Sequence, residues 1–324
     1  MLDLVDIEGA AERLSGIAVE TPLLRSAELD QSVGGRVLLK PESFQPIGSF
    51  KIRGAYNLLS QLSAEEARHG AVAWSSGNHA QGVALAGKLL GIKTTIVMPK
   101  DAPQAKLDNT RRLGGEIVSY DRYTEDREAI ARGIAAERGA AIVPSYDHPH
   151  IIAGQGTVGL EIARQSQALG LPADQVVIPC GGGGLTSGCA VALKACLENV
   201  SVYTAEPEHY DDTAKSLESG ERVSVSETTP SICDALLTET PGQITFDIMH
   251  RLGVRGLVVT EEEIRNAIRF AFRHLKLVVE PGGAAALAAI LAGKLDTKDK
   301  TTAVVLSGGN IDVELFAEIQ AELT

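Results

Sequence analysis

The chain has 324 residues, of which 44% are hydrophobic and 22% are charged, as in an ordinary soluble globular protein. Its formal net charge of −12 argues against a nucleic-acid partner, and its longest apolar stretch, residues 282–293, is too short to span a bilayer. The length predicts about two domains. The acidic N-terminus lacks the basic flank and the apolar run of a signal peptide, so we expect a cytoplasmic protein.

Strand and helix patterns alternate along most of the chain. Strands are expected at residues 36–40, 71–74, 93–98, 116–119, 140–143, 176–179, 201–205 and 302–306. Helices are expected at residues 6–16, from 51, and at 77–91, 103–113, 123–138, 150–169, 185–198, 243–252, 261–275, 283–293 and from 312, whereas 207–242 is expected to be irregular.

The strands are apolar without alternation, and most are followed by a helix. This pattern predicts parallel sheets covered by helices on both faces. A compact βα block sets residues 70–147 apart as a small domain, which leaves residues 1–69 and 148–324 to build a large one. The four cysteines form no C-x-x-C pair and show no zinc-ligand spacing, which agrees with a reducing compartment.

Lys51 lies at the expected start of a helix, directly after Phe50. The helix dipole and the neighbouring cation Arg53 both favour the neutral form of such a lysine. A neutral lysine is what Schiff-base chemistry with a carbonyl compound requires. The alternative is a solvated lysine on a first helical turn.

A run of four glycines follows a buried strand and opens a helix that begins with Leu185. The run consists of Gly181, Gly182, Gly183 and Gly184. Backbone N–H groups at a helix start bind anions, and glycines let the backbone wrap around a phosphate. No Gly-Lys-Ser/Thr closes the run, and the G-x-G-x-x-G spacing fails. Glu206 nevertheless stands where a ribose-binding carboxylate would sit, which keeps a nicotinamide-dependent oxidoreductase open as an alternative.

Two other βα turns carry polar side chains. In Ser75-Ser76-Gly77-Asn78-His79, two hydroxyls, an amide and free helix N–H groups converge, which suits a carboxylate; a simple helix cap is the alternative. The turn Ser307-Gly308-Gly309-Asn310 is by itself an ordinary βα connection.

Together these stretches resemble the pyridoxal-phosphate enzymes of the tryptophan-synthase β-like fold (fold type II), within the serine/threonine dehydratase and serine racemase group. The matching stretches are Glu42 through Ala55, Ser75 through Gly82, Ile152 through Thr157, the glycine run, and Ser307 through Asn310, in the family's order. The resemblance implies an α/β protein of two domains, each with a mostly parallel sheet flanked by helices, with pyridoxal 5′-phosphate in the cleft. It also implies a homodimer or a higher homo-oligomer.

The resemblance implies a role for each matching residue. Lys51 would carry the cofactor covalently and take the Cα proton, with Phe50 against the pyridine ring. Asn78 would bind the 3′-hydroxyl, Ser307 would face the pyridine nitrogen, and the backbone of residues 181–185 would hold the phosphate. The substrate carboxylate would be held in a closing loop by Ser75, Ser76, Asn78 and His79.

A serine opposite the ring nitrogen leaves that nitrogen largely unprotonated, so a long-lived carbanion is disfavoured. When a hydroxyl leaves Cβ, the electron pair left on Cα by the lost proton forms the Cα–Cβ double bond at once. This favours β-elimination of a 3-hydroxy amino acid to a 2-oxo acid and ammonia. L-Threonine and L-serine are the expected substrates. Racemases of the group place a serine at the position of Ser76, so a serine or aspartate racemase and a 3-hydroxyaspartate ammonia-lyase stay open as alternatives.

Two carboxylates six residues apart, Glu206 and Asp212, flank the backbone carbonyl of Tyr210. Such oxygens suit a hard divalent cation such as magnesium, calcium or manganese. In the resemblance they match the metal ligands of the racemase and hydroxyaspartate-dehydratase branch, which weakens the ribose interpretation of Glu206. A solvated acidic loop is the alternative.

Arg127 falls about where the racemase branch keeps an arginine that reaches a second substrate carboxylate. Its acidic neighbours Glu125, Asp126 and Glu128 make a surface salt bridge the alternative. The chain ends soon after Asn310, which leaves no room for the C-terminal regulatory domain of biosynthetic threonine deaminases and favours a degradative or racemase-like member.

Overall fold

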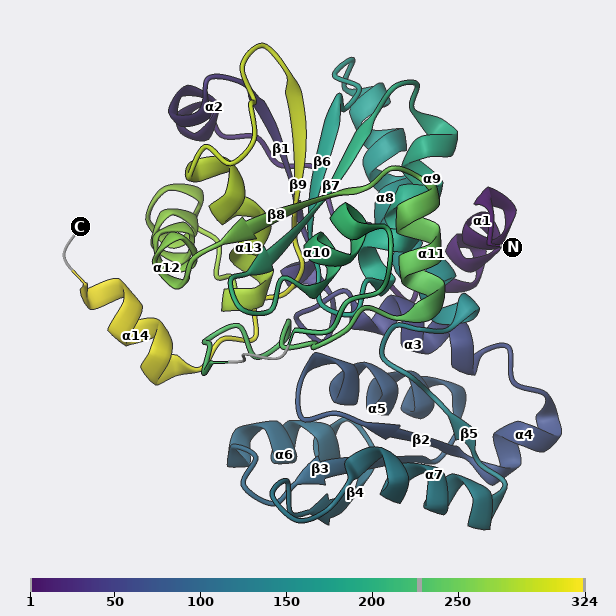
Figure 1. Ribbon diagram of the computed structural model, residues 1–324. Coiled ribbons are helices and arrows are strands. Elements are labelled where there is room, and N and C mark those ends of the chain that lie inside the picture. Colours follow the sequence, from purple (N-terminus) through teal and green to yellow (C-terminus); the bar gives the residue numbers. More distant parts are fainter. Residues whose placement is uncertain (1, 226–228, 323–324) are drawn as a thin grey trace.

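The structure is a computed structural model that describes residues 2–225 and 229–322. It contains two β-sheets with helices on their faces (Figure 1). The larger sheet has five strands in the order β1-β9-β6-β7-β8, and the smaller has four in the order β4-β3-β2-β5. All neighbouring strands in both sheets run parallel, which confirms the predicted α/β class.

The strands are β1 (Arg36–Pro41), β2 (Ala71–Trp74), β3 (Thr94–Pro99), β4 (Gly115–Tyr120), β5 (Ala141–Ile142), β6 (Gln175–Pro179), β7 (Ser201–Pro207), β8 (Arg255–Val259) and β9 (Thr301–Leu306). The α-helices are α1 (Leu4–Leu14), α2 (Ala27–Val33), α3 (Lys51–Leu59), α4 (Ala64–His69), α5 (Asn78–Leu90), α6 (Gln104–Arg112), α7 (Arg127–Arg138), α8 (Pro149–Ala168), α9 (Gly184–Cys196), α10 (Asp212–Ser219), α11 (Gln243–Arg251), α12 (Glu261–Phe270), α13 (Pro281–Leu291) and α14 (Val313–Ala321). A 3-10 turn, η1 (Glu42–Phe44), and a π-helical turn, η2 (Ala271–Leu275), complete the elements.

The large sheet is buried on both faces, which explains why its strands are apolar without alternation. Successive residues of β6 enter different cores: Val177 packs with helices α12 and α13, whereas Val176 and Ile178 pack with α8 and α9. Strand β9 divides in the same way, with Val304 on one face and Val305 on the other. Such two-sided burial is the rule for parallel sheets.

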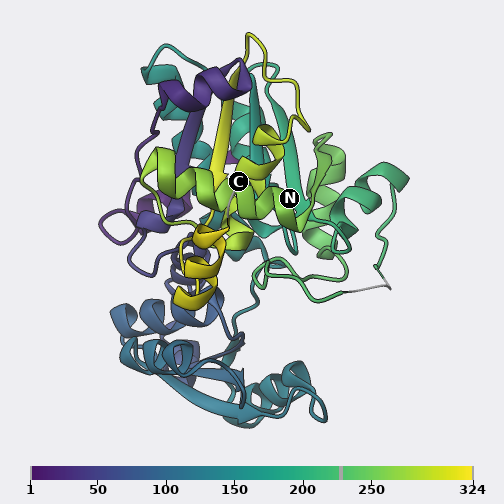
Figure 2. The ribbon, with the colours of Figure 1, turned by 90° about the vertical axis from the view of Figure 1, so that its left-hand side faces the viewer.

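Helix α3 connects the two sheets. Its residues Ile52, Ala55 and Leu59 lie in the same core as Ala73 of β2 and helix α5, although α3 precedes the small sheet in the chain. In both views α3 lies between the large sheet and the small one (Figures 1 and 2). The predicted domain boundaries at residues 69/70 and 147/148 remain a prediction, and this core crosses the first of them.

Five elements differ from the sequence-based expectations. The stretch 207–242, predicted to be irregular, contains helix α10. Positions 226–228 of this stretch lie outside the described residues. Helix α7 begins at Arg127 instead of residue 123, because Asp126 accepts hydrogen bonds from two backbone N–H groups of its first turn. The short helices α2 and α4 were not predicted, although Ser26 and Ser63 cap them. Strand β8 was also missed, because it lies at the sheet edge and is mostly half-exposed.

No helix in the part of the chain that the structure describes has the length and apolar character needed to cross a membrane. The four cysteines are all free thiols, and Cys180, Cys189 and Cys233 are buried.

Candidate active site

Lys51, the first residue of α3, lies where three segments meet. Its Nζ donates a hydrogen bond of 3.0 Å to the backbone carbonyl of Ser145. The same carbonyl accepts a 3.3 Å hydrogen bond from the side chain of Gln155 on α8. The Nζ also lies 5.1 Å from the centre of the Phe50 ring. Lys51 is thereby held on the segment that returns from the small sheet to the large sheet.

Burial lowers the pKa of Lys51 to about 8, and the negative charge of Glu280 opposes this shift. The expectation that Arg53 favours the neutral lysine is wrong, because Arg53 is fully engaged with carboxylates on the opposite side of α3. Desolvation is therefore the physical cause of the more easily deprotonated lysine.

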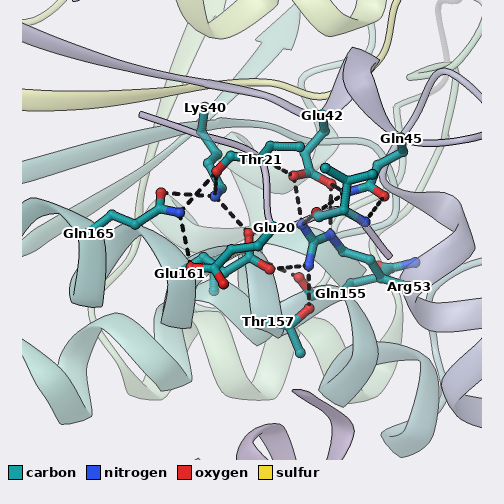
Figure 3. A network of polar contacts seen from close by, with 12 residues as sticks. Glu20, Thr21, Lys40, Glu42, Gln45, Arg53, Gln155, Thr157, Glu161 and Gln165 are labelled. Carbon is teal, nitrogen blue, oxygen red and sulfur yellow. Dashed lines mark hydrogen bonds and ion pairs between the residues drawn. The ribbon is translucent and has the colours of Figure 1, made fainter. Parts of the chain in front are cut away.

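Arg53 belongs to a buried ionic network that fastens α3 to strand β1 and helix α8 (Figure 3). Its guanidinium donates to Glu42 at 2.7 and 2.9 Å and to Glu161 at 2.5 and 3.0 Å. Lys40 lies 2.6 Å from the same Glu161 carboxylate. These contacts join strand β1, turn η1, helix α3 and helix α8, so the start of α3 has a fixed position.

Three residues of the glycine run, residues 182–184, are packed so closely that a side chain would not fit without a shift of its neighbours. A Cβ at Gly182 would stand 2.4 Å from the ring of Tyr146, and one at Gly184 would stand 2.5 Å from Oε1 of Gln155. Gly183 has φ +91°, a left-handed conformation that favours glycine, and it precedes the first residue of α9. The first N–H groups of α9 have no intrahelical partners, as at the start of every helix. Together with the glycine run before them, they form the kind of backbone that binds an anion.

Oε1 of Gln155 lies against this run and has no hydrogen-bond partner among the described residues. A buried acceptor without a partner is costly and marks a place where a ligand atom or water is expected. The sequence indicates that the stretch around Gln155 matters, but it does not predict a role for this side chain.

The turn before α5 approaches the lysine. A Cβ at Gly82 of α5 would stand 3.1 Å from the backbone of Lys51, so the two helices are in close contact. Ser75 accepts a 3.2 Å hydrogen bond from the N–H of Gly77. Ser75 and Ser76 are half-buried in this turn. The turn therefore brings two hydroxyls and the N-terminus of α5 to the same region as Lys51.

His79 lies at the same helix start, but its ring is turned inward. Nε2 is 2.9 Å from the carbonyl of Val143, and the side chain is buried. Burial, with the nearby charge of Lys51, lowers the pKa of His79 to about 3, so the imidazole is neutral. In this arrangement the ring fastens the start of α5 to the carbonyl of Val143.

The turn after β9 is joined directly to the lysine segment. The N–H of Phe50 donates to the carbonyl of Ser307 at 3.2 Å, and that of Gly309 donates to Gly48 at 2.9 Å. Ser307 is buried. Lys51 and Ser307 therefore share one rigid backbone unit.

Sequence reasoning missed Glu280, which precedes α13. Its carboxylate accepts a 2.6 Å hydrogen bond from the side-chain amide of Asn78, whose oxygen accepts 2.7 Å from Asn310. Burial and then the charge of Asp234 raise the pKa of Glu280 to about 7. No sequence motif indicates a role for Glu280, which lies directly before an apolar run.

Glu206 and Asp212 lie close enough for their charges to interact, and both side chains are buried. Glu206 accepts hydrogen bonds of 2.9 and 2.8 Å from the N–H groups of Thr213 and Ala214 at the start of α10. Burial and then the charge of Asp212 hold the pKa of Glu206 well above its ordinary value. Neither oxygen of Asp212 has a hydrogen-bond partner among the described residues.

The chain turns between these carboxylates at His209, where φ is +70°, and Tyr210 is buried. No group of three or more His, Cys, Asp or Glu side chains suited to a metal occurs in residues 2–225 and 229–322. The predicted site has only two carboxylates and a backbone carbonyl.

Arg127 is exposed at the start of α7, and its neighbours are occupied elsewhere. Asp126 caps the helix, and Glu128 pairs with Arg132 at 2.5 Å. Arg127 itself makes no hydrogen bond or ion pair with the residues described. Its charge is close enough to lower the pKa of Tyr146, which burial raises. The surface salt bridge considered from the sequence is therefore absent from the described part of the chain.

Comparisons with known proteins agree with this geometry. The family "Pyridoxal-phosphate dependent enzyme" matches residues 14–308. The chain is 41% identical to an L-threo-3-hydroxyaspartate ammonia-lyase of a Pseudomonas species, with 97% of both chains covered. It is 42% identical to the L-threonine ammonia-lyase of Thermotoga maritima, covering 98% of this chain and 78% of that protein. The solved structure of maize serine racemase has a TM-score of 0.92 and 35% identity, with 98% of this chain and 96% of that chain covered.

Proposed function

The chain belongs to the family of pyridoxal-phosphate dependent enzymes, and on that premise we propose that it deaminates a 3-hydroxy amino acid, with L-threonine or L-serine as the substrate. The net reaction breaks the Cα–H and Cβ–O bonds and releases water. The resulting enamine takes up water and yields a 2-oxo acid and ammonia. The observation that carries the proposal is Lys51, a lysine with a pKa of about 8 between the Phe50 ring, the Ser307 turn and the carbonyl of Ser145.

The residues present fit pyridoxal phosphate. Gly182, Gly183 and Gly184 have no room for a Cβ, and the unpartnered Oε1 of Gln155 lies beside them. The first N–H groups of α9 would hold the phosphate, Lys51 would carry the cofactor covalently, and Asn78 and Ser307 would face polar atoms of its ring. When bound, pyridoxal phosphate supplies an electron sink for the amino-acid Cα.

The chain supplies the proton transfer. With a pKa of about 8, the Lys51 amine is neutral in a useful fraction of molecules near neutral pH, so its Nζ can accept the Cα proton. Ser307 is a neutral partner for a ring nitrogen, which favours prompt loss of the Cβ hydroxyl over a long-lived carbanion. The position of Glu206 had left a nicotinamide dinucleotide open as the ligand of the glycine run, and membership of this family favours pyridoxal phosphate instead.

The turn before α5 would hold the substrate carboxylate. The hydroxyls of Ser75 and Ser76 and the N-terminus of α5 offer donors and a positive dipole end beside Lys51. The inward-facing ring of His79 makes no direct contact with substrate in this assignment and instead keeps the turn in place through Val143. Residues 70–147 would move as a unit to close this turn over the substrate.

A 3-hydroxyaspartate is the second candidate substrate, and Arg127 favours it. Arg127 is an unpaired, exposed cation near Tyr146, which itself lies against Gly182. A second substrate carboxylate would be bound by such a guanidinium. Ser76 keeps racemisation as an alternative, because its half-buried hydroxyl belongs to the turn before α5, the helix that packs against Lys51.

We also infer a divalent cation at Glu206, Asp212 and the carbonyl of Tyr210. Two buried carboxylates repel each other, and the oxygens of Asp212 have no partner among the described residues. A buried, unpaired carboxylate pair is unfavourable unless a cation compensates it. A cation would brace α10, whose Thr213 hydroxyl donates to the carbonyl of Gly181 at 3.4 Å.

We also infer a cytoplasmic location and an assembly of identical subunits. Four free thiols agree with a reducing cytoplasm. A homodimer or higher homo-oligomer rests on the family resemblance and is tested by the mass of the purified protein in solution.

Oxo-acid assays on purified protein test the proposed function. Cofactor-loaded protein should release 2-oxo acid and ammonia in equal amounts from L-threonine or L-serine, and Lys51→Ala should abolish both this activity and the visible absorbance band of the covalently held cofactor. Lys100→Ala, which removes an exposed lysine of the small domain, is the matched control and should retain both. Loaded protein that shows no such band, or that releases no oxo acid from threonine, serine or a hydroxyaspartate, would contradict the proposal.

A further inference from the structure

The carboxylate of Asp147 caps a helix that is distant in sequence. Helix α11 begins after Gly242, which has no side chain to cap it. The oxygens of Asp147 instead accept hydrogen bonds from the N–H groups of Gln243 at 3.0 Å, Ile244 at 2.9 Å and Thr245 at 3.3 Å. A Cβ at position 242 would stand 2.5 Å from Asp147, so glycine is needed for this approach. Three otherwise unpaired donors and the positive end of the helix dipole are thus satisfied by one carboxylate.

The capped end of α11 in turn holds the glycine run. The buried hydroxyl of Thr245 donates to the carbonyl of Gly182 at 2.7 Å, and the N–H of Gly242 donates to the same carbonyl at 3.2 Å. A trans peptide directs its carbonyl and its N–H to opposite sides. Because the Gly182 carbonyl is held against α11, the N–H of Gly183 is turned to the other side of the run.

Asp147 also belongs to a short segment, residues 143–147, that touches several parts of the site. Val143 accepts from His79, Ser145 accepts from Lys51, and the ring of Tyr146 covers Gly182 and Gly184. Asp147 then caps α11. These five consecutive residues therefore contact the start of α5, Lys51, the glycine run and helix α11.

We propose that Asp147 is a positioning residue for the phosphate group of the cofactor: it fixes the start of α11, so that Thr245 and Gly242 hold the Gly182 peptide in the orientation that presents the Gly183 N–H to the phosphate. This inference rests on the proposed function, because it takes the glycine run as the phosphate site. Asp147 touches neither the cofactor nor the substrate in this assignment.

Binding measurements on the apoprotein test this role. Asp147→Asn keeps the shape of the side chain but removes its charge and half of its acceptor capacity, and Thr245→Val removes only the hydroxyl. Each should weaken binding of pyridoxal phosphate and of inorganic phosphate on the order of tenfold. Thr245→Ser, which retains the hydroxyl, should bind both as the unaltered protein does.

Asp3→Asn is the matched control, because Asp3 caps α1 in the same way through the N–H groups of Val5 and Asp6. It should lower the unfolding temperature about as much as Asp147→Asn while leaving both dissociation constants unchanged. Equal phosphate affinity in Asp147→Asn, Thr245→Val and the unaltered protein would overturn the inference, as would an equal loss in Asp3→Asn. If Asp147→Asn fails to fold, the comparison of Thr245→Val with Thr245→Ser decides.

Inorganic phosphate separates this inference from the proposed function, since its binding does not involve Lys51. Protein that binds phosphate tightly but never gains the visible band with pyridoxal phosphate would refute the proposed function and leave the positioning role in place. Protein that gains the band, with phosphate binding insensitive to Asp147, would refute the positioning role alone.

Discussion

The side-chain amide of Asn78 donates a 2.6 Å hydrogen bond to the carboxylate of Glu280, and this bond joins the start of α5, beside the small sheet, to the start of α13, beside the large one. Glu280 is buried, and its charge raises the pKa of Lys51 against the stronger effect of desolvation. One acidic residue therefore both holds the turn and raises the pH range in which the lysine becomes neutral.

Glu280→Gln should shift the pH dependence of cofactor capture to lower pH. Capture requires the neutral amine, so its rate rises as pH increases through the pKa of Lys51, about 8. The glutamine removes the negative charge that stabilises the ammonium form, so the midpoint should fall below that of the unaltered protein. Stopped-flow absorbance of apoprotein mixed with pyridoxal phosphate across pH 6 to about 10 measures it. Glu314→Gln removes an equal charge from the exposed start of α14 and should leave the midpoint in place; an unmoved or raised midpoint in Glu280→Gln contradicts the prediction.

Arg53→Met should be one of the most destabilising single substitutions in the chain. It leaves Glu42, fully buried, and Glu161 without their guanidinium partner (Figure 3). Removing one partner of a buried ion pair costs about 3–5 kcal/mol, whereas an exposed pair contributes about 1 kcal/mol or less. Urea unfolding of the apoprotein measures the difference. Arg164→Met, which breaks the exposed pair with Glu8, is the control, and a similar loss in both variants would show that the network does not hold α3.

The order of strands and helices and the residues around Lys51 could be predicted because local patterns encode them. Apolar strands, terminal glycines and the Ser-Phe-Lys and tetraglycine motifs are contiguous in sequence. The helix α10 could not be predicted, because its cap is Glu206, which lies before the helix across a turn. Asp147 caps α11 from about a hundred residues away, a relationship that only the folded chain contains.

Electrostatic causes were equally hard to predict from the sequence. Proximity in sequence suggested that Arg53 repels Lys51, but residues two apart on a helix point to different faces, and Arg53 pairs with carboxylates on the other side. Glu280 was missed because it is distant in sequence from both Asn78 and Lys51. Burial, which dominates the pKa of Lys51, His79 and Glu280, becomes apparent only in the fold.

Removal of a divalent cation should reverse the order of stability of the unaltered protein and Asp212→Asn. Chelation of the unaltered protein should lower its unfolding temperature, and magnesium, calcium or manganese should restore it, because the cation compensates Glu206 and Asp212. In chelated protein Asp212→Asn should be more stable than the unaltered chain, since it relieves the repulsion between two buried carboxylates. In the presence of the cation the order should reverse. The control Asp211→Asn removes a neighbouring carboxylate that pairs with Lys215, and it should keep the response to metal. An unfolding temperature that ignores the cation after verified removal would exclude the site.

Arg127→Gln should discriminate between the two candidate substrates. If Arg127 binds a second carboxylate, the substitution should lower kcat/KM for L-threo-3-hydroxyaspartate about ten- to a hundredfold, in line with a lost hydrogen bond to a charged group, and leave kcat/KM for L-threonine nearly unchanged. Arg127→Lys keeps the charge but not the planar pair of donors, so it should restore only part of the hydroxyaspartate activity. Arg132→Gln, on the same helix but paired with Glu128, is the control and should affect neither substrate. Since Arg127 has no partner among the described residues, the substitution should also leave the free energy of unfolding unchanged, so a loss of activity cannot be attributed to unfolding. Equal kcat/KM values for hydroxyaspartate in Arg127→Gln and the unaltered enzyme would remove the dicarboxylate assignment and leave threonine or serine as the substrate.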